Sequence, residues 1–375
     1  MSQINPIIGA LNELGQSVWY DNLSRDVLLS GELKRLVESG ISGLTSNPTI
    51  FKKAIADSKD YDEEIQSLLR RGMDAEGICQ ELMLQDVGAA ADLLLETYRT
   101  SGGRDGYASL EVSPHLARDA KGTLQAALGL WRRLNRPNIM IKIPGTAEGL
   151  SAVREALEAG VNVNITLLFS LEVYEKVVEQ YLSALEARLA RGQDISTLAS
   201  VASFFVSRVD AVCEKTFAEL LRSGKANPAD RESFFGKVGV ANAKLTYGSF
   251  QKLFSSPRFL KLRERGAGVQ RPLWASTGTK NPSLNPLLYV EELAGPNTVN
   301  TVPPATLAIL MAKGKVKPCL THGLAEARET ILRLSALGLN FDGLMAQLQD
   351  EGVELFRASY DELILAVKSK CQILR

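Results

Sequence analysis

One lysine in the middle of an apolar run is the first residue whose type and position could do chemistry. Lys142 lies inside residues 138–143, Asn-Ile-Met-Ile-Lys-Ile, and Pro144-Gly145 ends the run. This pattern predicts a short buried strand. A lysine is seldom fully buried unless it is paired or reactive. Burial of a lysine favours its neutral amine, which is the nucleophile of Schiff-base chemistry. The competing interpretation is an edge-strand lysine that points into water.

Further polar side chains lie on or just after other apolar runs. They are Asp21, Asn47, Glu111, Asn164, Thr166, Ser203 and Ser276. For any one of them alone, a satisfied core group is the ordinary interpretation. If they converge with Lys142, the amine gains carboxylates that can move protons, and amides and hydroxyls that can bind a polyhydroxylated substrate. The set therefore predicts one site, provided that the fold brings the ends of these runs together.

Strands alternating with helices are the elements that must position these side chains. Strand patterns occupy residues 16–21, 41–47, 108–113, 138–146, 161–168, 198–206, 271–277 and 298–302, with helical periodicity between them. Such alternation implies parallel pairing through crossover helices. We predict an α/β fold, a (β/α)8 TIM barrel with extra N-terminal and C-terminal helices. An open doubly wound sheet is the runner-up, but the sequence has neither a Gly-x-Gly-x-x-Gly turn after the first strand nor a P-loop.

The chain shows no linker or internal repeat, so we expect a single domain over residues 1–375. A helical insertion is expected at about 52–80 and a C-terminal helical extension at about 320–370, and residues 26–38 read as one helix. The 375 residues carry a formal net charge of zero. This balance disfavours a nucleic-acid or anionic-membrane surface.

Cysteine usage and the start of the chain predict a cytoplasmic protein. The four cysteines have none of the short spacings of zinc or redox motifs. We read no secretory signal peptide and no membrane-spanning stretch. His115 and His322 stand alone in the sequence, so we expect no histidine-rich metal site, and a carboxylate-only magnesium site is an alternative that no spacing supports. Ser203 and Ser276 lack the Gly-x-Ser-x-Gly context of a serine hydrolase.

Three segments resemble the transaldolase family. Residues 43–51, Gly-Leu-Thr-Ser-Asn-Pro-Thr-Ile-Phe, match its first signature, and residues 139–146, Ile-Met-Ile-Lys-Ile-Pro-Gly-Thr, match the signature around its Schiff-base lysine. Residues 162–170 resemble its fifth strand. The similarity runs from about residue 19 to about 280. The extra length resembles the longer bacterial members, some of which occur fused to a glucose-6-phosphate isomerase.

This resemblance implies a transferase of the non-oxidative pentose phosphate pathway with no cofactor and no metal. A dihydroxyacetone unit would move from sedoheptulose 7-phosphate to glyceraldehyde 3-phosphate, giving erythrose 4-phosphate and fructose 6-phosphate. Lys142 would form the Schiff base, Glu111 with Thr166 and a water would shuttle protons, and Asp21 would take the C4 hydroxyl proton. The residues implied in binding are Asn47, Asn164 and Ser203 for the dihydroxyacetone hydroxyls, and Arg208, Ser276 and Lys280 for the phosphate.

One departure concerns the phosphate site. Better-known family members have Ala-Ser-Phe-Arg-Asn after the seventh strand, whereas residues 275–281 read Ala-Ser-Thr-Gly-Thr-Lys-Asn, two residues longer. Lys280 would bind phosphate as a point charge, whereas arginine offers a planar fork.

The competing functions are a fructose 6-phosphate aldolase, a pyridoxal-phosphate enzyme using Lys142, and a non-catalytic sugar-phosphate binding barrel. The aldolase subgroup carries glutamine at the proton-shuttle position and tyrosine where Phe205 stands, so Glu111 and Phe205 favour transaldolase. Expected partners are sugar-phosphate substrates, with no nucleic acid and no membrane. The chain is expected to be a monomer or a homodimer.

Overall fold

A computed structural model describes residues 4–56, 58–224 and 226–374, and its centre is a closed barrel of parallel strands in the order β1 to β8. The strands are β1 (Gln16–Tyr20), β2 (Gly43–Thr45), β3 (Tyr107–Glu111), β4 (Ile139–Pro144), β5 (Val163–Leu168), β6 (Ser200–Phe205), β7 (Arg271–Ala275) and β8 (Thr298–Val302). The predicted (β/α)8 barrel and its strand order are confirmed, and each strand falls within a predicted segment or within one residue of it.

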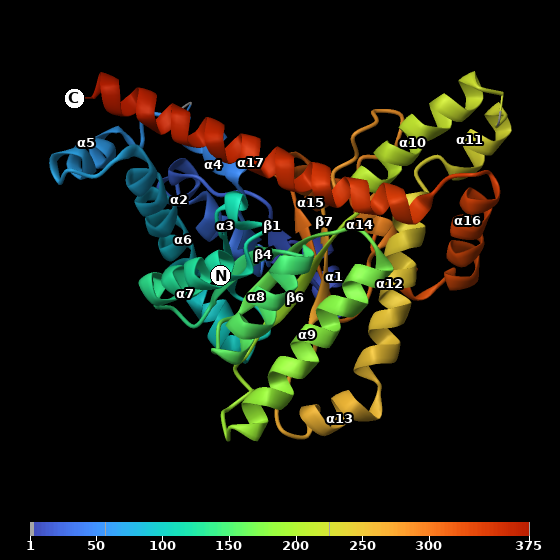
Figure 1. Ribbon diagram of the computed structural model, residues 1–375, viewed down its shortest axis with the longest axis horizontal. Coiled ribbons are helices and arrows are strands. Elements are labelled where there is room, and N and C mark those ends of the chain that lie inside the picture. Colours follow the sequence, from blue (N-terminus) through green and yellow to red (C-terminus); the bar gives the residue numbers. More distant parts are fainter. Residues whose placement is uncertain (1–3, 57, 225, 375) are drawn as a thin grey trace.

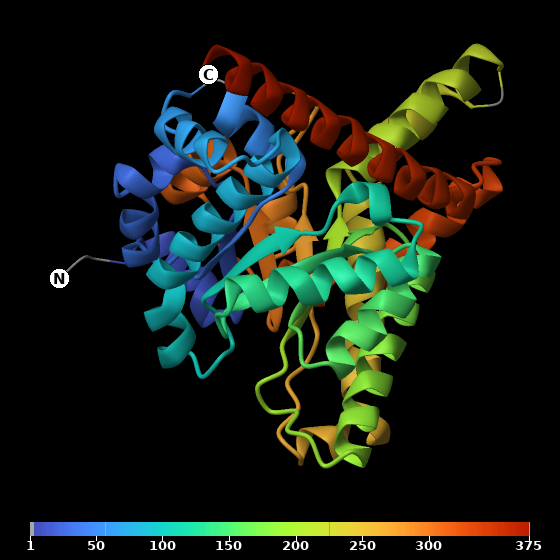
Figure 2. The ribbon, with the colours of Figure 1, turned by 60° about the vertical axis from the view of Figure 1, so that its left-hand side comes forward.

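Helices surround the barrel, as Figures 1 and 2 show. They are α1 (Pro6–Glu13), α2 (Arg25–Leu29), α3 (Glu32–Glu38), α4 (Pro48–Ala56), α5 (Asp62–Arg70), α6 (Ala75–Thr100), α7 (Ala120–Leu134), α8 (Ala147–Glu158), α9 (Leu171–Ala190), α10 (Ser207–Arg222), α11 (Pro228–Phe234), α12 (Val238–Phe254), α13 (Pro257–Arg263), α14 (Leu288–Glu292), α15 (Pro304–Lys313), α16 (Leu324–Ala336) and α17 (Phe341–Ile373), with 3-10 turns η1 (Pro114–Leu116) and η2 (Cys319–Thr321).

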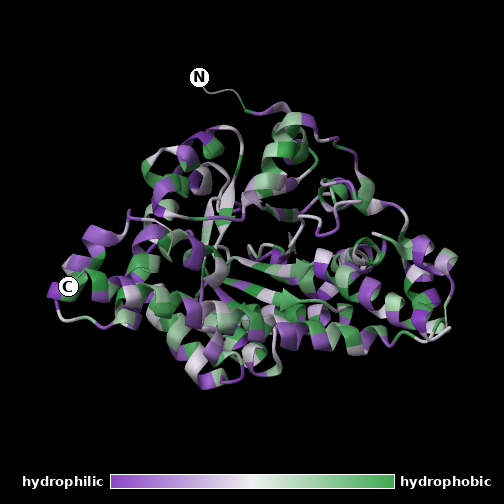
Figure 3. Cartoon of the chain, turned by 90° about the horizontal axis from the view of Figure 1, so that it is seen from above, coloured by the Kyte–Doolittle hydropathy of each residue, from purple (hydrophilic) through white to green (hydrophobic). Residues whose placement is uncertain are grey.

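The strands are buried along nearly their whole length. A parallel barrel packs its inner face on itself and its outer face on helices, so its strands read as near-continuous apolar runs. Figure 3 shows the same distribution, with hydrophobic strands in the middle and hydrophilic residues on the outer helices. This pattern explains why strand positions could be read from the sequence.

Residues 26–38, which read as one helix, form two. Helix α2 ends at Leu29 and α3 begins at Glu32, and Gly31 between them has a φ of 73°. That backbone conformation favours glycine and interrupts a helix. The apolar periodicity continues across the break at Gly31, and this periodicity was the basis for predicting one helix over residues 26–38.

The sequence places a helix start directly after the lysine strand. Thr146 follows β4, and its hydroxyl accepts from the Gly149 N–H at 3.0 Å to cap α8. The same hydroxyl donates to the Ala117 carbonyl at 2.5 Å. Because Thr146 caps the helix, α8 begins at Ala147, and only Gly145 and Thr146 separate it from the end of β4.

Helix α17 is the longest helix and crosses the molecule from the right-hand side of Figure 1 to the chain end at upper left. It packs most extensively on α4 and also contacts α5, α6, α10 and β5. Across the described ranges, no helix combines the length and apolar character needed to span a bilayer.

Candidate active site

A cavity of about 370 Å³ lies at the carboxyl ends of the strands. The predicted site residues that line it are Asp21, Asn47, Lys142, Thr166, Ser203, Phe205, Arg208, Ser276 and Lys280. The two others, Glu111 and Asn164, lie behind the lining, each bonded to one of its members. The barrel therefore brings the sequence-predicted residues to one place.

Lys142 is buried at the base of this cavity. Only 5% of the residue is exposed, and its Nζ donates to Glu111 Oε2 at 3.1 Å and to the Ser46 carbonyl at 2.9 Å. Strand β4 pairs with β3 on one side and β5 on the other. The edge-strand interpretation of this lysine is therefore wrong.

Glu111 is the acid beside the amine. Its position at the end of β3 is in register with Lys142 on β4, and its side chain is 6% exposed. Burial raises the pKa of Glu111, and the Lys142 charge opposes that rise. A carboxyl with a raised pKa beside an amine is a better proton acceptor than an ordinary carboxylate and can return the proton that it takes.

Asp21 is held by hydroxyl groups. Thr45 Oγ1 donates to Asp21 Oδ1 at 2.7 Å and lies 2.6 Å from Thr301 Oγ1. Because Thr45 has one hydroxyl proton and directs it at Asp21, Thr301 must donate to Thr45. Burial raises the pKa of Asp21, while the Thr45 bond and the Lys142 and Lys280 charges oppose this.

Thr166 presents an unused hydroxyl to the cavity. Its Oγ1 is buried and has no hydrogen-bond partner among the described residues. Leaving such a group unpaired costs about 1–3 kcal/mol. An unpaired hydroxyl in a cavity lining is therefore available to a bound molecule.

Asn164 has a supporting position. Its side-chain amide donates to Ser109 Oγ at 3.2 Å and accepts from Ser203 Oγ at 2.6 Å. These bonds orient Ser203, which does line the cavity. Asn47 differs, because its amide oxygen accepts from the Ile50 N–H at 3.0 Å and its amide N–H groups have no partner among the described residues.

The positive side of the cavity is built from α10 and the loop after β7. The Arg208 guanidinium lies over the Phe205 ring, 5.3 Å from its centroid, and burial lowers the pKa of Arg208. Ser276 has a φ of 57°, and its Oγ lies 2.9 Å from Ser207 Oγ. Lys280 is exposed at the rim. This side could hold an anion.

Several lining residues were not found from the sequence. They are Thr45, Thr301, Leu355, Phe356 and Ser359. Thr45 lies within the first signature segment and Thr301 in an alternating strand, so each had a weak signal. Phe356 and Ser359 lie on α17, where helical periodicity predicted a helix and gave no indication of its position over the barrel.

A larger cavity, of about 820 Å³, lies elsewhere. It runs beside α10 and residues 280–284, and Lys280 is the one described lining residue that it shares with the lysine cavity. Volume alone therefore does not locate the chemistry here. No group of three or more His, Cys, Asp or Glu side chains within the described ranges is arranged to hold a metal ion.

Comparisons with known proteins agree over nearly the whole chain. The family model described as Transaldolase/Fructose-6-phosphate aldolase matches residues 18–367. The chain is 43% identical over 368 residues to a protein of Saccharopolyspora erythraea named transaldolase, with 98% of each covered. It is 43% identical over 370 residues to transaldolase 2 of Nostoc punctiforme, with 97% of each covered. A transaldolase of Mycolicibacterium smegmatis is 42% identical over 368 residues, with 98% of each covered.

Proposed function

Because this chain belongs to the transaldolase/fructose-6-phosphate aldolase family and its curated relatives are transaldolases, it is an enzyme of the transaldolase class, and we propose that Lys142, Glu111 and Asp21 divide its chemistry. The reaction moves a dihydroxyacetone unit from sedoheptulose 7-phosphate to glyceraldehyde 3-phosphate and yields erythrose 4-phosphate and fructose 6-phosphate. It belongs to the non-oxidative pentose phosphate pathway.

The first step is Schiff-base formation at Lys142. The neutral amine attacks the C2 ketone of the donor, and the carbinolamine then loses water to give an iminium ion. Glu111 takes the excess proton from nitrogen and returns it to the leaving hydroxyl. The 3.1 Å separation of Lys142 Nζ and Glu111 Oε2 supports this role. The unpaired Thr166 hydroxyl supports the binding of a water that relays the proton.

The second step is cleavage of the C3–C4 bond. Asp21 removes the proton of the C4 hydroxyl, C4 leaves as an aldehyde, and the bonding electrons pass into the iminium to give an enamine on Lys142. The acceptor aldehyde then reacts with the enamine, Asp21 returns its proton to the new hydroxyl, and hydrolysis of the iminium releases the product. The raised pKa of Asp21 supports its use as a base.

The remaining cavity residues bind the two ends of the substrate. Asn47 and Ser203 hold the dihydroxyacetone hydroxyls, and Asn164 acts through Ser203. Arg208, Ser276 and Lys280 hold the phosphate. Lys280 is the exposed member of this group, so its share of phosphate affinity depends more on salt than that of Arg208. We also propose that the enzyme works in the cytoplasm, as a monomer or homodimer, without a cofactor or metal.

The observation that carries this proposal is the buried Lys142–Glu111 pair that opens onto a cavity also lined by Asp21. Its test is reduction with borohydride in the presence of fructose 6-phosphate, followed by peptide mapping. We expect a single modified lysine, Lys142, with and without prior EDTA treatment. Lys53 and Lys280 line the same cavity and serve as internal controls. Modification of either one in place of Lys142 would contradict the proposal.

The family also contains fructose 6-phosphate aldolases, which release free dihydroxyacetone. Glu111 and Phe205 favour the transferase, because a proton donor at the Phe205 position would help to quench the enamine. Assaying dihydroxyacetone release and transfer to erythrose 4-phosphate in the same sample distinguishes the two activities. A spectrum without pyridoxal absorbance, together with trapping by substrate alone, argues against the pyridoxal-phosphate and binding-barrel alternatives.

A further inference from the structure

Four residues of α17 face the barrel at helical spacing. Gln349, Gly352, Phe356 and Ser359 are separated by three, four and three residues, which places them on one face of the helix. Gln349 Nε2 donates to the Gly145 carbonyl at 3.0 Å and the Leu167 carbonyl at 3.1 Å. Ser359 Oγ accepts from Thr49 Oγ1 at 2.9 Å. This face of α17 is therefore fixed at both ends, with Phe356 between them.

Gly352 allows α17 to approach the cavity closely. A Cβ at this position would lie 3.0 Å from Leu167 Cδ2 and 3.6 Å from an Arg208 guanidinium nitrogen. A methyl group would therefore be tight against Leu167, which would have to shift by a few tenths of an ångström, and would be in ordinary contact with Arg208. Gly352 thus lets this turn of α17 lie directly against Leu167 and Arg208.

Phe356 completes an aromatic clamp around Arg208. The Arg208 guanidinium carbon lies 5.9 Å from the Phe356 ring centroid and 5.3 Å from that of Phe205. Among the described residues, Arg208 makes no hydrogen bond or ion pair. Ring faces attract the cation without using its N–H donors. The clamp therefore orients a guanidinium whose donors remain free for an anion in the cavity.

The same ring also faces the reactive amine. Lys142 Nζ lies 6.0 Å from the Phe356 ring centroid, and Phe356 is only 5% exposed. One ring thus lies between the amine that reacts with the ketone and the cation that faces the anionic end. It can therefore set the spacing of the two subsites.

We propose that Phe356 is a specificity-determining residue that selects phosphorylated sugars by positioning Arg208 for the phosphate. The proposal rests on the phosphate role of Arg208 in the proposed function. It adds that discrimination between phosphorylated and unphosphorylated sugars depends on α17, the C-terminal helix, which follows all eight strands in the chain. An acceptor without a phosphate does not use Arg208 and gains little from the clamp.

The test compares erythrose 4-phosphate with erythrose as acceptors. Because transfer proceeds through an enamine, kcat/KM for the acceptor reports on the acceptor half-reaction alone. The quantity to compare is the ratio of kcat/KM for the phosphorylated acceptor to that for the unphosphorylated one. Phe356→Leu removes the ring contact that orients Arg208, so it should lower this ratio about tenfold.

Matched variants make the result specific. Phe356→Tyr keeps the ring and should leave the ratio within about twofold of the original. Phe356→Met fills similar space without a ring and replaces the leucine variant if that one fails to fold. Leu365→Ala changes an exposed residue of the same helix and should have no effect. An unchanged ratio in a folded Phe356→Leu enzyme that still forms the borohydride adduct overturns this inference.

The two proposals fail in different ways. If the unmodified enzyme does not discriminate between the acceptors and Arg208→Met changes nothing, the phosphate role of Arg208 is wrong. If discrimination depends on Arg208 and survives in Phe356→Leu, only the role of Phe356 is wrong. A ratio that falls in both variants supports both.

Discussion

Asp21 and Glu111 are partly buried carboxyl groups that differ in what compensates their charge. Glu111 accepts directly from Lys142, whereas Asp21 accepts from Thr45, which in turn is supported by Thr301. Burial raises the pKa of both. Two acids with different partners can take different roles in one cavity, one in proton transfer at nitrogen and the other at the substrate hydroxyl.

Asp21→Ala should slow turnover while leaving Schiff-base formation intact. Loss of a positioned base costs at least about 10²-fold in rate, and fructose 6-phosphate should still be trapped on Lys142 by borohydride. Asp26→Ala, the same change at an exposed position early in α2, is the control. Near-normal turnover, or loss of trapping in a folded variant, would contradict the assignment.

The rate of Schiff-base formation should fall at low pH because of Glu111. Below its raised pKa the group is protonated and cannot accept the amine proton, so the acid limb should lie above about pH 4.3, the ordinary glutamate value. The rate of trapping by excess cyanoborohydride, which survives mild acid and reduces iminium ions, follows this step as a function of pH. Asp21→Ala should retain the limb and Glu111→Gln should lack it. A limb that persists in Glu111→Gln belongs to another group.

Phe205→Tyr should shift the products from transfer towards free dihydroxyacetone. Phe205 lines the cavity and is 7% exposed, so its phenyl ring offers the enamine no proton. A tyrosine hydroxyl supplies a donor and can orient a water. Dihydroxyacetone release and transfer to an acceptor are measured together for both proteins. If the hydroxyl lowers only stability and the product ratio stays constant, Phe205 is a packing residue.

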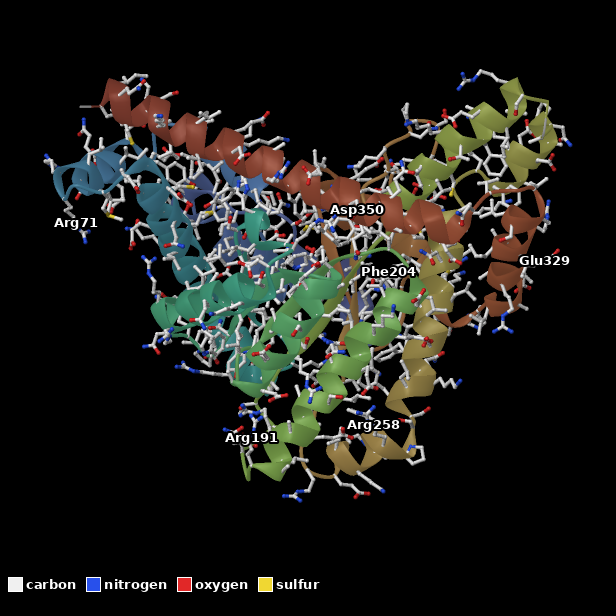
Figure 4. All side chains as sticks on the ribbon, viewed as in Figure 1. Arg71, Arg191, Phe204, Arg258, Glu329 and Asp350 are labelled. Carbon is white, nitrogen blue, oxygen red and sulfur yellow. The ribbon has the colours of Figure 1, made fainter. Side chains whose placement is uncertain are left out.

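At the scale of elements, side chains along the length of α17 bond to other parts of the molecule. Asp350, labelled in Figure 4, accepts from Arg118 at 2.7 Å, and Lys370 donates to Asp62 at 2.7 Å. These partners lie on the segment after β3 and on α5. The Gln349 amide donates to the Gly145 carbonyl, just after β4, and to the Leu167 carbonyl, near the end of β5, and these strands carry Lys142 and Thr166. Helix α17 thus joins the ends of both strands.

Gln349→Leu should destabilise the fold and reduce turnover together. The change keeps the side-chain volume similar but leaves two partly buried carbonyls without their donor, at a cost of about 1–3 kcal/mol. Thermal unfolding and kcat measure the two effects. Gln347→Leu is the matched control, because Gln347 is exposed and bonds only to Glu351 on the same helix. If both substitutions change stability and kcat equally, the bonds from Gln349 to the two carbonyls contribute no more than an exposed side-chain contact.

At the scale of the whole molecule, the two ends of the barrel have different roles. The carboxyl ends hold the reactive cavity, and a buried polar cluster closes the amino ends. In that cluster Arg271 of β7 donates to Ser17 Oγ at 2.7 Å and to Asp105 Oδ1 at 3.0 Å, and Trp19 donates to the same carboxylate at 3.0 Å. The cluster links β1, β7 and the segment before β3, which are far apart in sequence.

Arg271→Met should cost about 3–5 kcal/mol of unfolding free energy, because it leaves Asp105 buried without its cation. Urea unfolding measures the loss, and borohydride trapping on Lys142 should persist at the opposite end of the barrel. Arg258→Met is the matched surface control. Arg258, labelled in Figure 4, pairs with the exposed Glu179 and Glu186, and its substitution should cost about 1 kcal/mol or less. Equal losses would mean that the amino-end cluster does not close the barrel.

The sequence by itself determined the barrel, its strands and the reactive residues at their carboxyl ends. Parallel strands buried on both faces are continuous apolar runs, so their number and order could be read directly. The carboxyl ends of such strands must meet, which brought Asp21, Lys142 and Thr166 together without further information. Lys142 stood out because a charged residue interrupts an apolar run.

Only the tertiary structure decided which residues support and cover the site. Thr45 and Thr301 form one hydrogen-bonded chain with Asp21, yet 256 positions separate the two threonines. The side-chain bonds of Asn164 show that it supports Ser203 and does not line the cavity. Helical periodicity specifies which face of α17 is buried but not what lies beneath it, because packing partners come from distant parts of the chain. The position of Phe356 between Lys142 and Arg208 therefore required the folded chain.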